Sequence, residues 1–358
     1  QASLGWIYRE GYGGMTRDYK LAFAWYMKAA LQDYPNAQAS VGWLYREGLG
    51  VERDYAKSLD FYRKGAANGD LNAMGSLGYA LQNGLGTDVD YQQARQWYEK
   101  GVERNDAYSM SALAWLYREA KGVDQNYGMA LDLYKRAADL GDVTGMSSLG
   151  YMNQYGLGTP VNYNEALRWY EMAAAKNDAY SFASLGWMYR EGVGVARNYD
   201  KSLDYYRKGA DLGDLNAIGS MGYATQNGLG TPVNFDEARA WYQRGAEASD
   251  PYSMASLAWL YENGKGVKLD YIEAKYWYEK AANAYAMGNL SYLYDKGLGA
   301  SPDVQEAARL AFSAMEGGEA AFINDMKAGA VTYSPAFRQQ VQRGLKQRGY
   351  YTGPIDGI

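Results

Sequence analysis

Apolar and small residues recur along this chain at helical spacing. Met74, Leu77, Gly78 and Leu81 follow the i, i+3, i+4, i+7 pattern of one helix face, and a second helical pattern covers 91–102. The same pair of patterns returns about every 36 residues. Strand-like alternation with a period of two is absent from these segments. Each unit therefore predicts two α-helices joined by a loop.

The repeat can be followed through most of the chain. Copies of the first-helix motif begin at Leu4, Val41, Leu77, Leu113, Leu149, Leu185, Met221, Leu257 and Leu290. The segments 42–86 and 186–230 are identical at 34 of 45 positions, which indicates duplication of a four-repeat block. A period of this length is typical of solenoids and of propellers. Because the pattern within each repeat is helical, it indicates a solenoid. The predicted fold is all-α, a right-handed α-solenoid of stacked helix-turn-helix repeats.

One site on each first helix carries a very small residue. Its occupants are Gly42, Gly78, Ala114, Gly150, Gly186, Gly222, Ala258 and Ser291. Glycine inside a helix costs about 1 kcal/mol relative to alanine. We therefore expect the partner helix to approach this site too closely for a longer side chain.

The loops between the paired helices also repeat. The first helix is usually followed by a glycine suited to the left-handed conformation, at Gly48, Gly84, Gly156, Gly192, Gly228, Gly264 and Gly297, whereas Ala120 stands there in one repeat. Before the second helix stand Asp54, Asp90, Asn126, Asn162, Asn198, Asn234 and Asp270, which we predict to be N-caps rather than metal ligands. The glycine-rich loops such as 84–87 lack the Lys-Ser/Thr of a phosphate-binding loop and are predicted to be turns.

Composition removes several classes of function. The chain has no Cys and no His, which excludes disulfides, thiol nucleophiles, zinc fingers and histidine acid–base catalysis. A net charge of −5 with interspersed signs argues against nucleic-acid binding, and no run of about 18 apolar residues predicts membrane insertion. The recurring pairs Arg46-Glu47, Arg118-Glu119 and Arg190-Glu191 are predicted to be architectural, since adjacent residues are not expected to face each other on a helix. We predict no catalytic residue, no metal and no cofactor.

These residues resemble the Sel-1-like repeat family, which is related to tetratricopeptide repeats and has a longer loop between its helices. The family pattern is matched by residues 185–194, Leu-Gly-Trp-Met-Tyr-Arg-Glu-Gly-Val-Gly, and by 166–174, Ala-Leu-Arg-Trp-Tyr-Glu-Met-Ala-Ala. Asn153 and Thr225 depart from it by replacing a core tyrosine. The resemblance covers residues 1–317 as nine repeats, the first partial and the last a degenerate cap. It implies an adaptor that binds other proteins, often in bacterial envelope or signalling assemblies.

The C-terminal segment has another character. Residues 318–334 are predicted to form a degenerate capping helix and linker. Residues 335–358 resemble the first part of a truncated peptidoglycan-binding module through Val341, Gln342, Leu345, Gly349, Tyr350, Gly353, Asp356 and Gly357. The resemblance implies contact with peptidoglycan through Gly349, Tyr350, Gly353, Asp356 and Gly357. The alternative is a capping helix followed by a surface turn.

An aromatic and polar ladder marks the candidate binding surface. One first-helix position is aromatic in every copy, at Trp6, Trp43, Tyr79, Trp115, Tyr151, Trp187, Tyr223, Trp259 and Tyr292. Three residues later stand Arg9, Arg46, Gln82, Arg118, Gln154, Arg190, Gln226, Glu262 and Asp295. All of these except Arg9, Glu262, Tyr292 and Asp295 are candidate partner-binding residues of the solenoid groove, because Trp, Tyr and Arg are frequent in interface hot spots. Packing of the aromatics against the neighbouring repeat is the alternative, and mixed roles are expected.

Together these patterns predict a non-catalytic scaffold of the bacterial envelope that binds a protein or peptide in its groove. The location would be periplasmic or otherwise exported, with any signal peptide before Gln1, although a cytoplasmic location stays open. Three alternatives stay open too: the regulatory arm of a larger enzyme, a secreted or surface protein that binds a host molecule, and carbohydrate binding by the aromatic ladder. The sequence leaves the oligomeric state open.

Overall fold

The computed structural model describes residues 1–319 and 333–355. Over these residues the chain forms 19 α-helices and one 3-10 helix, η1 (Tyr12–Gly14), with no strand. The prediction of an all-α fold is therefore confirmed. Most of the predicted linker 318–334 lies outside the described residues.

Two helices make each repeat, as the pattern predicts. The first helices are α1 (Ala2–Glu10), α3 (Pro35–Glu47), α5 (Leu71–Asn83), α7 (Ala107–Arg118), α9 (Val143–Tyr155), α11 (Ala179–Glu191), α13 (Leu215–Asn227), α15 (Pro251–Asn263) and α17 (Ala284–Lys296). The second helices are α2 (Tyr19–Ala30), α4 (Tyr55–Ala67), α6 (Tyr91–Glu103), α8 (Tyr127–Asp139), α10 (Tyr163–Ala174), α12 (Tyr199–Asp211), α14 (Phe235–Glu247), α16 (Tyr271–Ala281) and α18 (Val304–Glu316). A last helix, α20, covers Pro335–Gln347.

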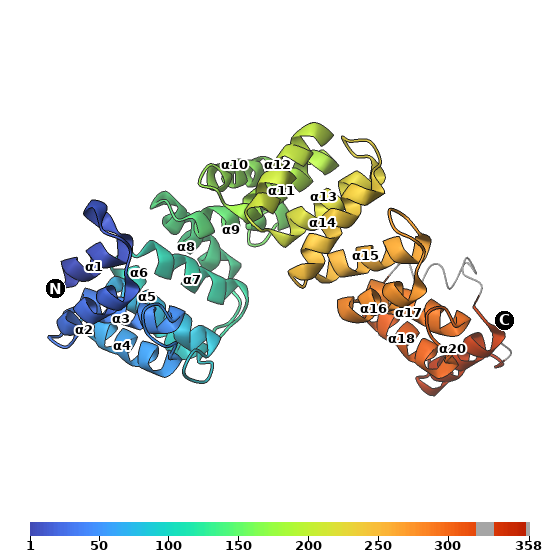
Figure 1. Cartoon of the computed structure of the whole chain (residues 1–358), viewed down its shortest axis with the longest axis horizontal. Coiled ribbons are helices and arrows are strands. Elements are labelled where there is room, and N and C mark those ends of the chain that lie inside the picture. The colour runs from blue at the N-terminus through green and yellow to red at the C-terminus, as the bar shows by residue number, and fades with distance from the viewer. Residues whose placement is uncertain (320–332, 356–358) are drawn as a thin grey trace. The chain divides into compact units, whose positions relative to one another are not determined.

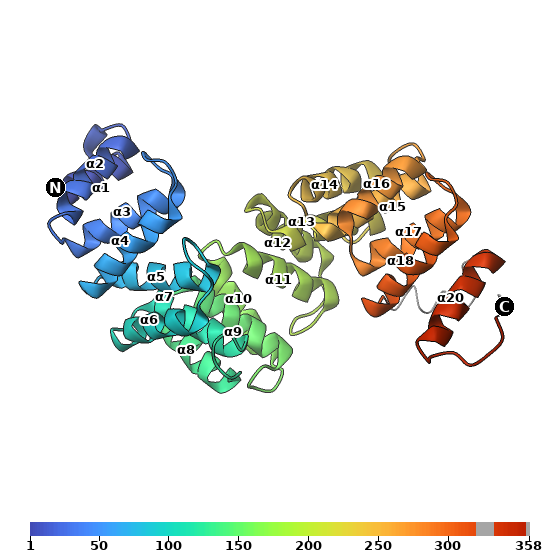
Figure 2. The ribbon, with the colours of Figure 1, turned by 90° about the horizontal axis from the view of Figure 1, so that it is seen from below.

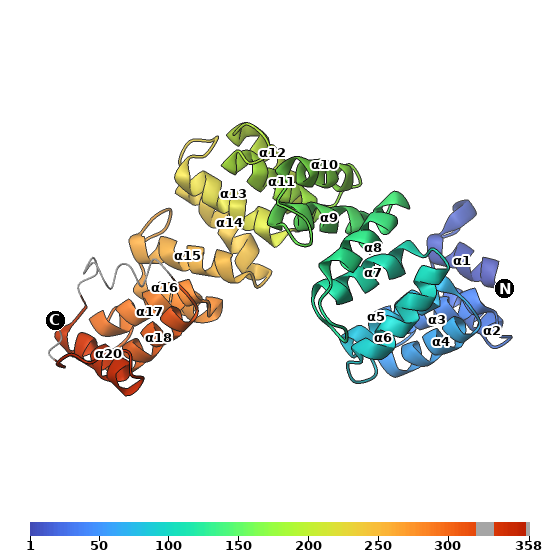
Figure 3. The same ribbon diagram turned by 180° about the vertical axis from the view of Figure 1, so that it is seen from behind.

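The chain divides into two compact units, Gln1–Asp178 and Ala179–Ile358. In the first unit, α3 packs against α4, α4 against α5, and α3 also touches α5 (Figure 1). In the second unit, α11, α12 and α13 repeat these contacts in the same order (Figure 3). Each unit is thus a stack of helix pairs in chain order, which is the packing of an α-solenoid.

A buried tyrosine on the second helix explains the small site on the first. Tyr62 is almost fully buried, and its ring crosses Gly42 so closely that a Cβ there would lie 2.7 Å from Cδ1. Tyr206 lies against Gly186 in the same way, with a Cβ distance of 2.5 Å. The eight core tyrosines of this series are Tyr26, Tyr62, Tyr98, Tyr134, Tyr170, Tyr206, Tyr242 and Tyr278. The predicted close approach of the helices is confirmed.

The loop glycines fix the turn and the next contact. Gly48 ends α3 in the left-handed conformation with φ +69°, as predicted, and Ala120 adopts φ +54° at the equivalent position after α7. Two residues further along this loop, Gly122 lies against the preceding repeat, where a Cβ would be 2.6 Å from Cβ of Tyr91. The loop therefore needs a left-handed residue to turn and a second glycine to pack against the neighbouring repeat.

The predicted N-caps of the second helices are confirmed. The Asp54 carboxylate accepts a hydrogen bond from the backbone N–H of Lys57, and the Asn126 side chain accepts one from Met129. The first helices have caps that the sequence analysis missed: Asp70, Asp106, Asp142, Asp214 and Asp250 accept backbone hydrogen bonds in the same way. Except at α1 and α3, which have no side-chain cap, the α-helices with a described N-cap thus begin at an oxygen-bearing side chain that satisfies a free backbone N–H.

Helix α20 extends the stack of the second unit. Phe337 and Val341 are buried against the alanines of α18, and Figure 2 shows α20 beside that helix. The start of α20 is held by Asp295 of α17, whose carboxylate accepts a hydrogen bond of 2.8 Å from the backbone N–H of Ser334. The Arg348 guanidinium lies 4.0 Å from the centre of the Phe312 ring. These contacts cover the last repeat with an amphipathic helix.

Candidate functional site

The two sets of helices present different chemistry to solvent. Helices α5, α9 and α13 contain no Asp, Glu, Lys or Arg. Apart from Thr144 and Leu215, their exposed side chains are aromatic or carry amides, as at Tyr79 and Asn83 of α5. We call the solvent-facing stripes of α3, α5, α7, α9, α11, α13 and α15 the first-helix face.

The second helices carry most of the charge, and they pair it internally. Lys64 Nζ lies 2.7 Å from Oδ2 of Asp60 on α4, and Lys208 and Asp204 form the same pair at 2.8 Å on α12. Each pair spans one helical turn, where oppositely charged side chains stabilise an isolated helix by about 0.2–0.5 kcal/mol. Such intrahelical pairs are typical of a solvated surface, so the first-helix face is the better candidate for binding.

The predicted ladder residues lie at the edge between core and solvent. Trp6, Tyr79 and Tyr223 are exposed, whereas Trp43, Trp115, Tyr151, Trp187 and Trp259 are half-buried. Among the polar residues of the ladder, Gln154 is buried and Arg46, Gln82, Arg118, Arg190 and Gln226 are half-buried. Some ladder side chains are thus packed into the structure and others are open to solvent. The role of the ladder in partner binding stays a prediction.

Arginine and aromatic positions meet between repeats. The Arg46 guanidinium lies over the ring of Tyr79, with Cζ 5.7 Å from the ring centre. The same contact joins the guanidinium to the next repeat's ring at Arg9–Trp43, Arg118–Tyr151 and Arg190–Tyr223, at 5.6, 5.1 and 5.6 Å. A cation over an aromatic face contributes about 0.5–1 kcal/mol at exposed sites. Each arginine therefore fixes the aromatic of the following repeat.

The expectation that adjacent Arg and Glu do not face each other is wrong. Arg46 Nε donates to Oε1 of Glu47 at 2.6 Å, and the pairs Arg118–Glu119 and Arg190–Glu191 do so at 2.7 Å. These pairs stand at the last turn of the helix, where the two long side chains can bend toward each other past the helix end. The consequence is that each ladder arginine has its charge balanced by its neighbour.

At three ladder positions without arginine, the polar residue bonds to the core tyrosine of its repeat. Tyr98 Oη donates to Oε1 of Gln82 at 3.1 Å, and Tyr170 Oη donates to Oε1 of Gln154 at 2.9 Å. Glu262 takes this place near the end of the stack and accepts from Tyr278 Oη at 2.7 Å. Burial raises the pKa of the Glu262 carboxyl, although the hydrogen bond from Tyr278 opposes that shift.

The sequence analysis missed a second set of surface tyrosines. Tyr108 and Tyr252 stand near the start of α7 and α15, and 46% and 47% of each residue is exposed. Although the Tyr108 ring reaches solvent, burial by neighbouring groups raises the pKa of its hydroxyl to about 12, and the nearby Tyr79 adds to the shift. The missed signal was the 72-residue spacing of Tyr108, Tyr180 and Tyr252, which follows alternate repeats.

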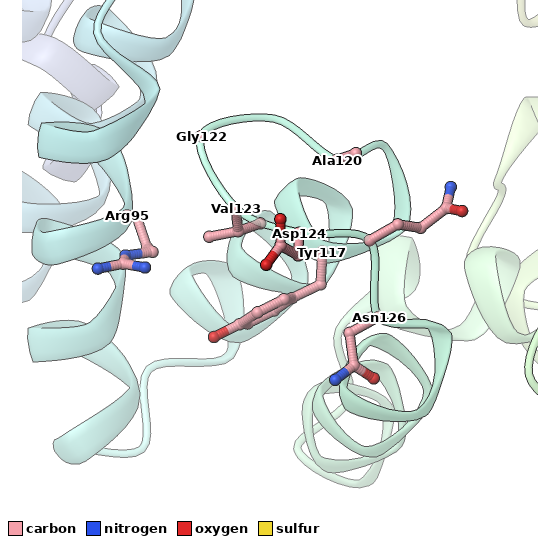
Figure 4. A pocket seen from close by; sticks show the side chains of 8 residues that line it. Arg95, Tyr117, Ala120, Gly122, Val123, Asp124 and Asn126 are labelled. Carbon is pink, nitrogen blue, oxygen red and sulfur yellow. The ribbon is translucent and has the colours of Figure 1, made fainter.

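A surface pocket of about 600 Å³ lies in the first unit between α6 and the loop after α7 (Figure 4). Arg95 of α6 borders it on one side, and Tyr117, Asp124 and Asn126 border it on the other. Arg95 Nε lies 3.4 Å from Oε1 of Glu99, so its charge is already balanced. The pocket is open and polar, and its lining offers no nucleophile paired with a base.

No cluster of three or more acidic side chains suited to a metal ion occurs within 1–319 and 333–355. Over the same part of the chain, no helix has the length and apolarity to cross a bilayer.

The predicted peptidoglycan-binding residues are only partly described. Gly349 adopts φ +77°, Tyr350 is 80% exposed and Gly353 lies in the turn that follows. Asp356 and Gly357 lie outside the described residues. Binding of peptidoglycan by this segment stays a prediction.

The sequence profile of the Sel1 repeat matches nine segments of the chain. They cover residues 1–34, 35–70, 71–106, 107–142, 143–178, 183–214, 216–250, 251–284 and 284–318. A comparison with curated proteins gave no match.

Solved structures with the same repeat are similar to this chain. A Sel1 repeat protein from Oxalobacter formigenes is 29% identical with a TM-score of 0.63, and the match covers 69% of this chain and 100% of that one. A protective antigen present in uropathogenic Escherichia coli strains, which displays an SLR fold, is 26% identical with a TM-score of 0.54. That match covers 98% of this chain and 85% of the antigen.

Proposed function

Because the chain belongs to the Sel1 repeat family, whose repeats mediate protein–protein interaction, we propose that its first-helix face is the surface that binds a protein or peptide partner. The main support for this proposal is the difference in surface chemistry between the first and the second helices. The second helices pair their charges within one helix, whereas the first-helix face leaves aromatic rings and amides in contact with solvent. Exposed tyrosine beside half-buried arginine and tryptophan is the composition of interface hot spots.

The proposal is tested with a charge placed on each face. Asn83 of α5 and Gln96 of α6 are both exposed polar residues, so Asn83→Lys and Gln96→Lys make a matched pair. Each variant and the parent chain would be immobilised and used to capture partners from an envelope extract, followed by mass spectrometry. We expect Asn83→Lys to capture clearly less of the partner than the parent and Gln96→Lys do. Equal capture by all three would refute binding at the first-helix face.

We further propose that the protein is exported and acts as a scaffold in the bacterial envelope. One structural relative is a protective antigen of uropathogenic Escherichia coli, which favours an exposed location. The C-terminal segment supports the same location through its similarity to a peptidoglycan-binding module, and Tyr350 is open to solvent there. Co-sedimentation of the chain with purified peptidoglycan tests that contact. The proposal predicts co-sedimentation that is weakened by Tyr350→Ala but kept by Tyr276→Ala, and absence of the chain from the pellet would overturn it.

A further inference from the structure

We infer that the chain carries two equivalent peptide-binding sites, one in each unit, and that each takes an extended, uncharged, proline-rich segment. The inference rests on the proposed function, because both sites lie on the first-helix face. It adds the number of sites, their residues and the chemistry of the ligand.

The first site, which we call cluster 1, is formed by Arg46, Tyr79 and Tyr108 on three successive first helices. Arg46 lies over the Tyr79 ring, and Asn83 donates to the backbone carbonyl of Tyr79 at 2.8 Å. The Tyr79 and Tyr108 rings are 38% and 46% exposed. Arg46, Tyr79 and Tyr108 stand on α3, α5 and α7, and α5 contacts both α3 and α7.

A glycine lets Tyr108 lie flat on the surface. A Cβ on Gly75 of α5 would come within 2.8 Å of Cδ1 of Tyr108. Behind it, the buried Tyr98 ring makes an edge contact with Tyr108, with ring centres 6.4 Å apart. Tyr108 is therefore held in one orientation by the helix on which it rests and by the core.

The second unit contains the same arrangement 144 residues later, as cluster 2. Arg190 lies 5.6 Å from the Tyr223 ring centre, and Tyr252 lies against Gly219, whose Cβ would be 2.9 Å from Cδ1. Tyr252 makes the edge contact with the buried Tyr242 at 6.3 Å. Asn227 donates to the Tyr223 carbonyl at 2.8 Å, as Asn83 does in cluster 1. Figure 3 shows α11, α13 and α15, which carry cluster 2, in succession.

Other repeats lack part of this set. At the position of Gly75 and Gly219, the repeats carry Ala39, Ser111, Ser147, Ala183 and Ala255, with Gly288 in the last repeat. At the position of Tyr108 and Tyr252 stand Asn36, Asn72, Thr144 and Asn216. Tyr180 has the tyrosine and follows Arg118 and Tyr151, but Ser147 replaces the glycine of Gly75 and Gly219. Tyr285 has the tyrosine but stands near the buried acid Glu262 instead of an arginine. Two complete clusters, one for each unit, are therefore what the described residues provide.

The charge balance of the clusters selects a neutral ligand. Arg46 gives its Nε to Glu47, and neither of its Nη groups has a hydrogen-bond partner among the described residues. Arg190 is paired with Glu191 in the same way. Each cluster thus offers hydrogen-bond donors without net positive charge. An acidic peptide would gain little there, because the neighbouring glutamate cancels the attraction of the guanidinium.

A polyproline II segment matches these clusters, because it presents neutral hydrogen-bond acceptors beside flat apolar proline rings. Its backbone makes no internal hydrogen bonds, so its carbonyls are free to accept from the guanidinium Nη groups and the phenol hydroxyls. Proline rings pack on exposed aromatic rings, and the extended backbone is already ordered before it binds. Tyr79 with Tyr108 and Tyr223 with Tyr252 provide two such pairs of rings.

Calorimetric titration of the intact chain tests this inference. The probe is an uncharged peptide of Ala-Pro-Pro repeats, and the comparisons are an Ala-Gly-Ser peptide, an Ala-Glu-Pro peptide and a chitin oligosaccharide. We expect two sites per chain for the probe, with an affinity that changes by less than about twofold between about 0.05 and 0.5 M salt, since screening affects only charge contacts. One site per chain, or a preference for the acidic peptide or the sugar, would overturn the inference.

Variants separate the two clusters. Tyr108→Ala should lower the stoichiometry from two sites to one, Tyr252→Ala should do the same, and the double variant should abolish binding. Tyr276→Ala, which removes an exposed tyrosine from α16, should leave both sites intact. Tyr108→Phe keeps the ring and guards against misfolding, so it should retain the site at reduced affinity. If the probe fails to bind while Asn83→Lys still captures less partner than Gln96→Lys, the inference is wrong and the proposed function stands.

Discussion

The Tyr62 ring lies directly over the Cα of Gly42, so that a Cβ at Gly42 would be 2.7 Å from the ring. Real Cβ atoms are not found that close to a ring carbon, and Tyr62 is too well buried to move aside. This contact joins the two helices of a repeat, and it recurs wherever glycine holds the small site. The separation between the helices is therefore set by a tyrosine ring resting on bare backbone.

From this contact we predict that Gly42→Ala destabilises the chain. Alanine gains about 1 kcal/mol of helix propensity, but overpacking of a core typically costs about 1–3 kcal/mol. The net loss should be up to about 2 kcal/mol in the free energy of unfolding, measured by urea denaturation. Gly128→Ala is the control, because Gly128 is exposed on α8 and a Cβ there meets no atom closer than 3.5 Å. A Gly42→Ala chain as stable as the Gly128→Ala chain would contradict this account.

The loop residue Ala120 gives a prediction of the opposite sign. Ala120 adopts φ +54°, in the left-handed region where a side chain costs about 1–2 kcal/mol. Glycine avoids that strain but loses more conformational entropy on folding, by about 0.4–1 kcal/mol. We therefore expect Ala120→Gly to raise the unfolding free energy by up to about 1 kcal/mol. Gly48→Ala places the same strain in an earlier repeat and should lower the unfolding free energy. If both substitutions shifted the unfolding free energy in the same direction, the argument would be refuted.

Much of the fold can be predicted from the sequence, because the interactions that form each helix and turn are local and recur with the repeat. The helix faces, the left-handed glycine after α3 and the cap at Asp54 depend on residues within one repeat. The contact of Arg46 with Tyr79 depends on how one repeat is rotated against the next, and the period of 36 residues does not determine that rotation. The pairing of Arg46 with Glu47 was missed for a similar reason, since the rule for adjacent helix residues does not hold for long side chains at a helix end.

Tyr108 was missed because it follows a longer period than the helices do. Its position holds Asn36, Asn72 and Thr144 in other repeats, so a search at one repeat length sees no pattern. Only the paired occurrence of Gly75 with Tyr108 and of Gly219 with Tyr252 links the tyrosine to a packing site, and that link requires the stacked helices. The candidate site was therefore half predictable, through its arginines and the ladder tyrosines.

The raised pKa of Tyr108 leads to a prediction in alkaline solution. Its hydroxyl should ionise near pH 12, about two pH units above an ordinary tyrosine. Because the unfolded chain releases this proton near pH 10, the contribution of Tyr108 to stability is full below pH 10 and declines as the pH rises toward 12. Spectroscopic titration of tyrosinate measures this directly. Tyr108→Phe should remove signal only from the late part of the curve, whereas a loss near pH 10 would show that Tyr108 is unperturbed.

The carboxyl of Glu262 provides a test at acidic to neutral pH. Burial raises its pKa above the usual value of a glutamate, while Tyr278 Oη donates to it at 2.7 Å. A raised acid pKa means that the folded chain holds the proton longer than the unfolded chain does. Stability is then greatest below the unfolded pKa of about 4.3 and falls as the pH rises through the folded pKa.

Glu262→Gln should remove this pH dependence. Gln82 and Gln154 already accept a hydrogen bond from the core tyrosines of their own repeats, so glutamine can keep the contact with Tyr278 without a buried charge. We expect the variant to match the parent chain at pH 4 and to be more stable at pH 7, as measured by thermal unfolding at both pH values. Glu247→Gln, at the exposed end of α14, controls for the change in net charge. If both variants shift stability equally at pH 7, the gain comes from net charge and the buried carboxyl of Glu262 is not its source.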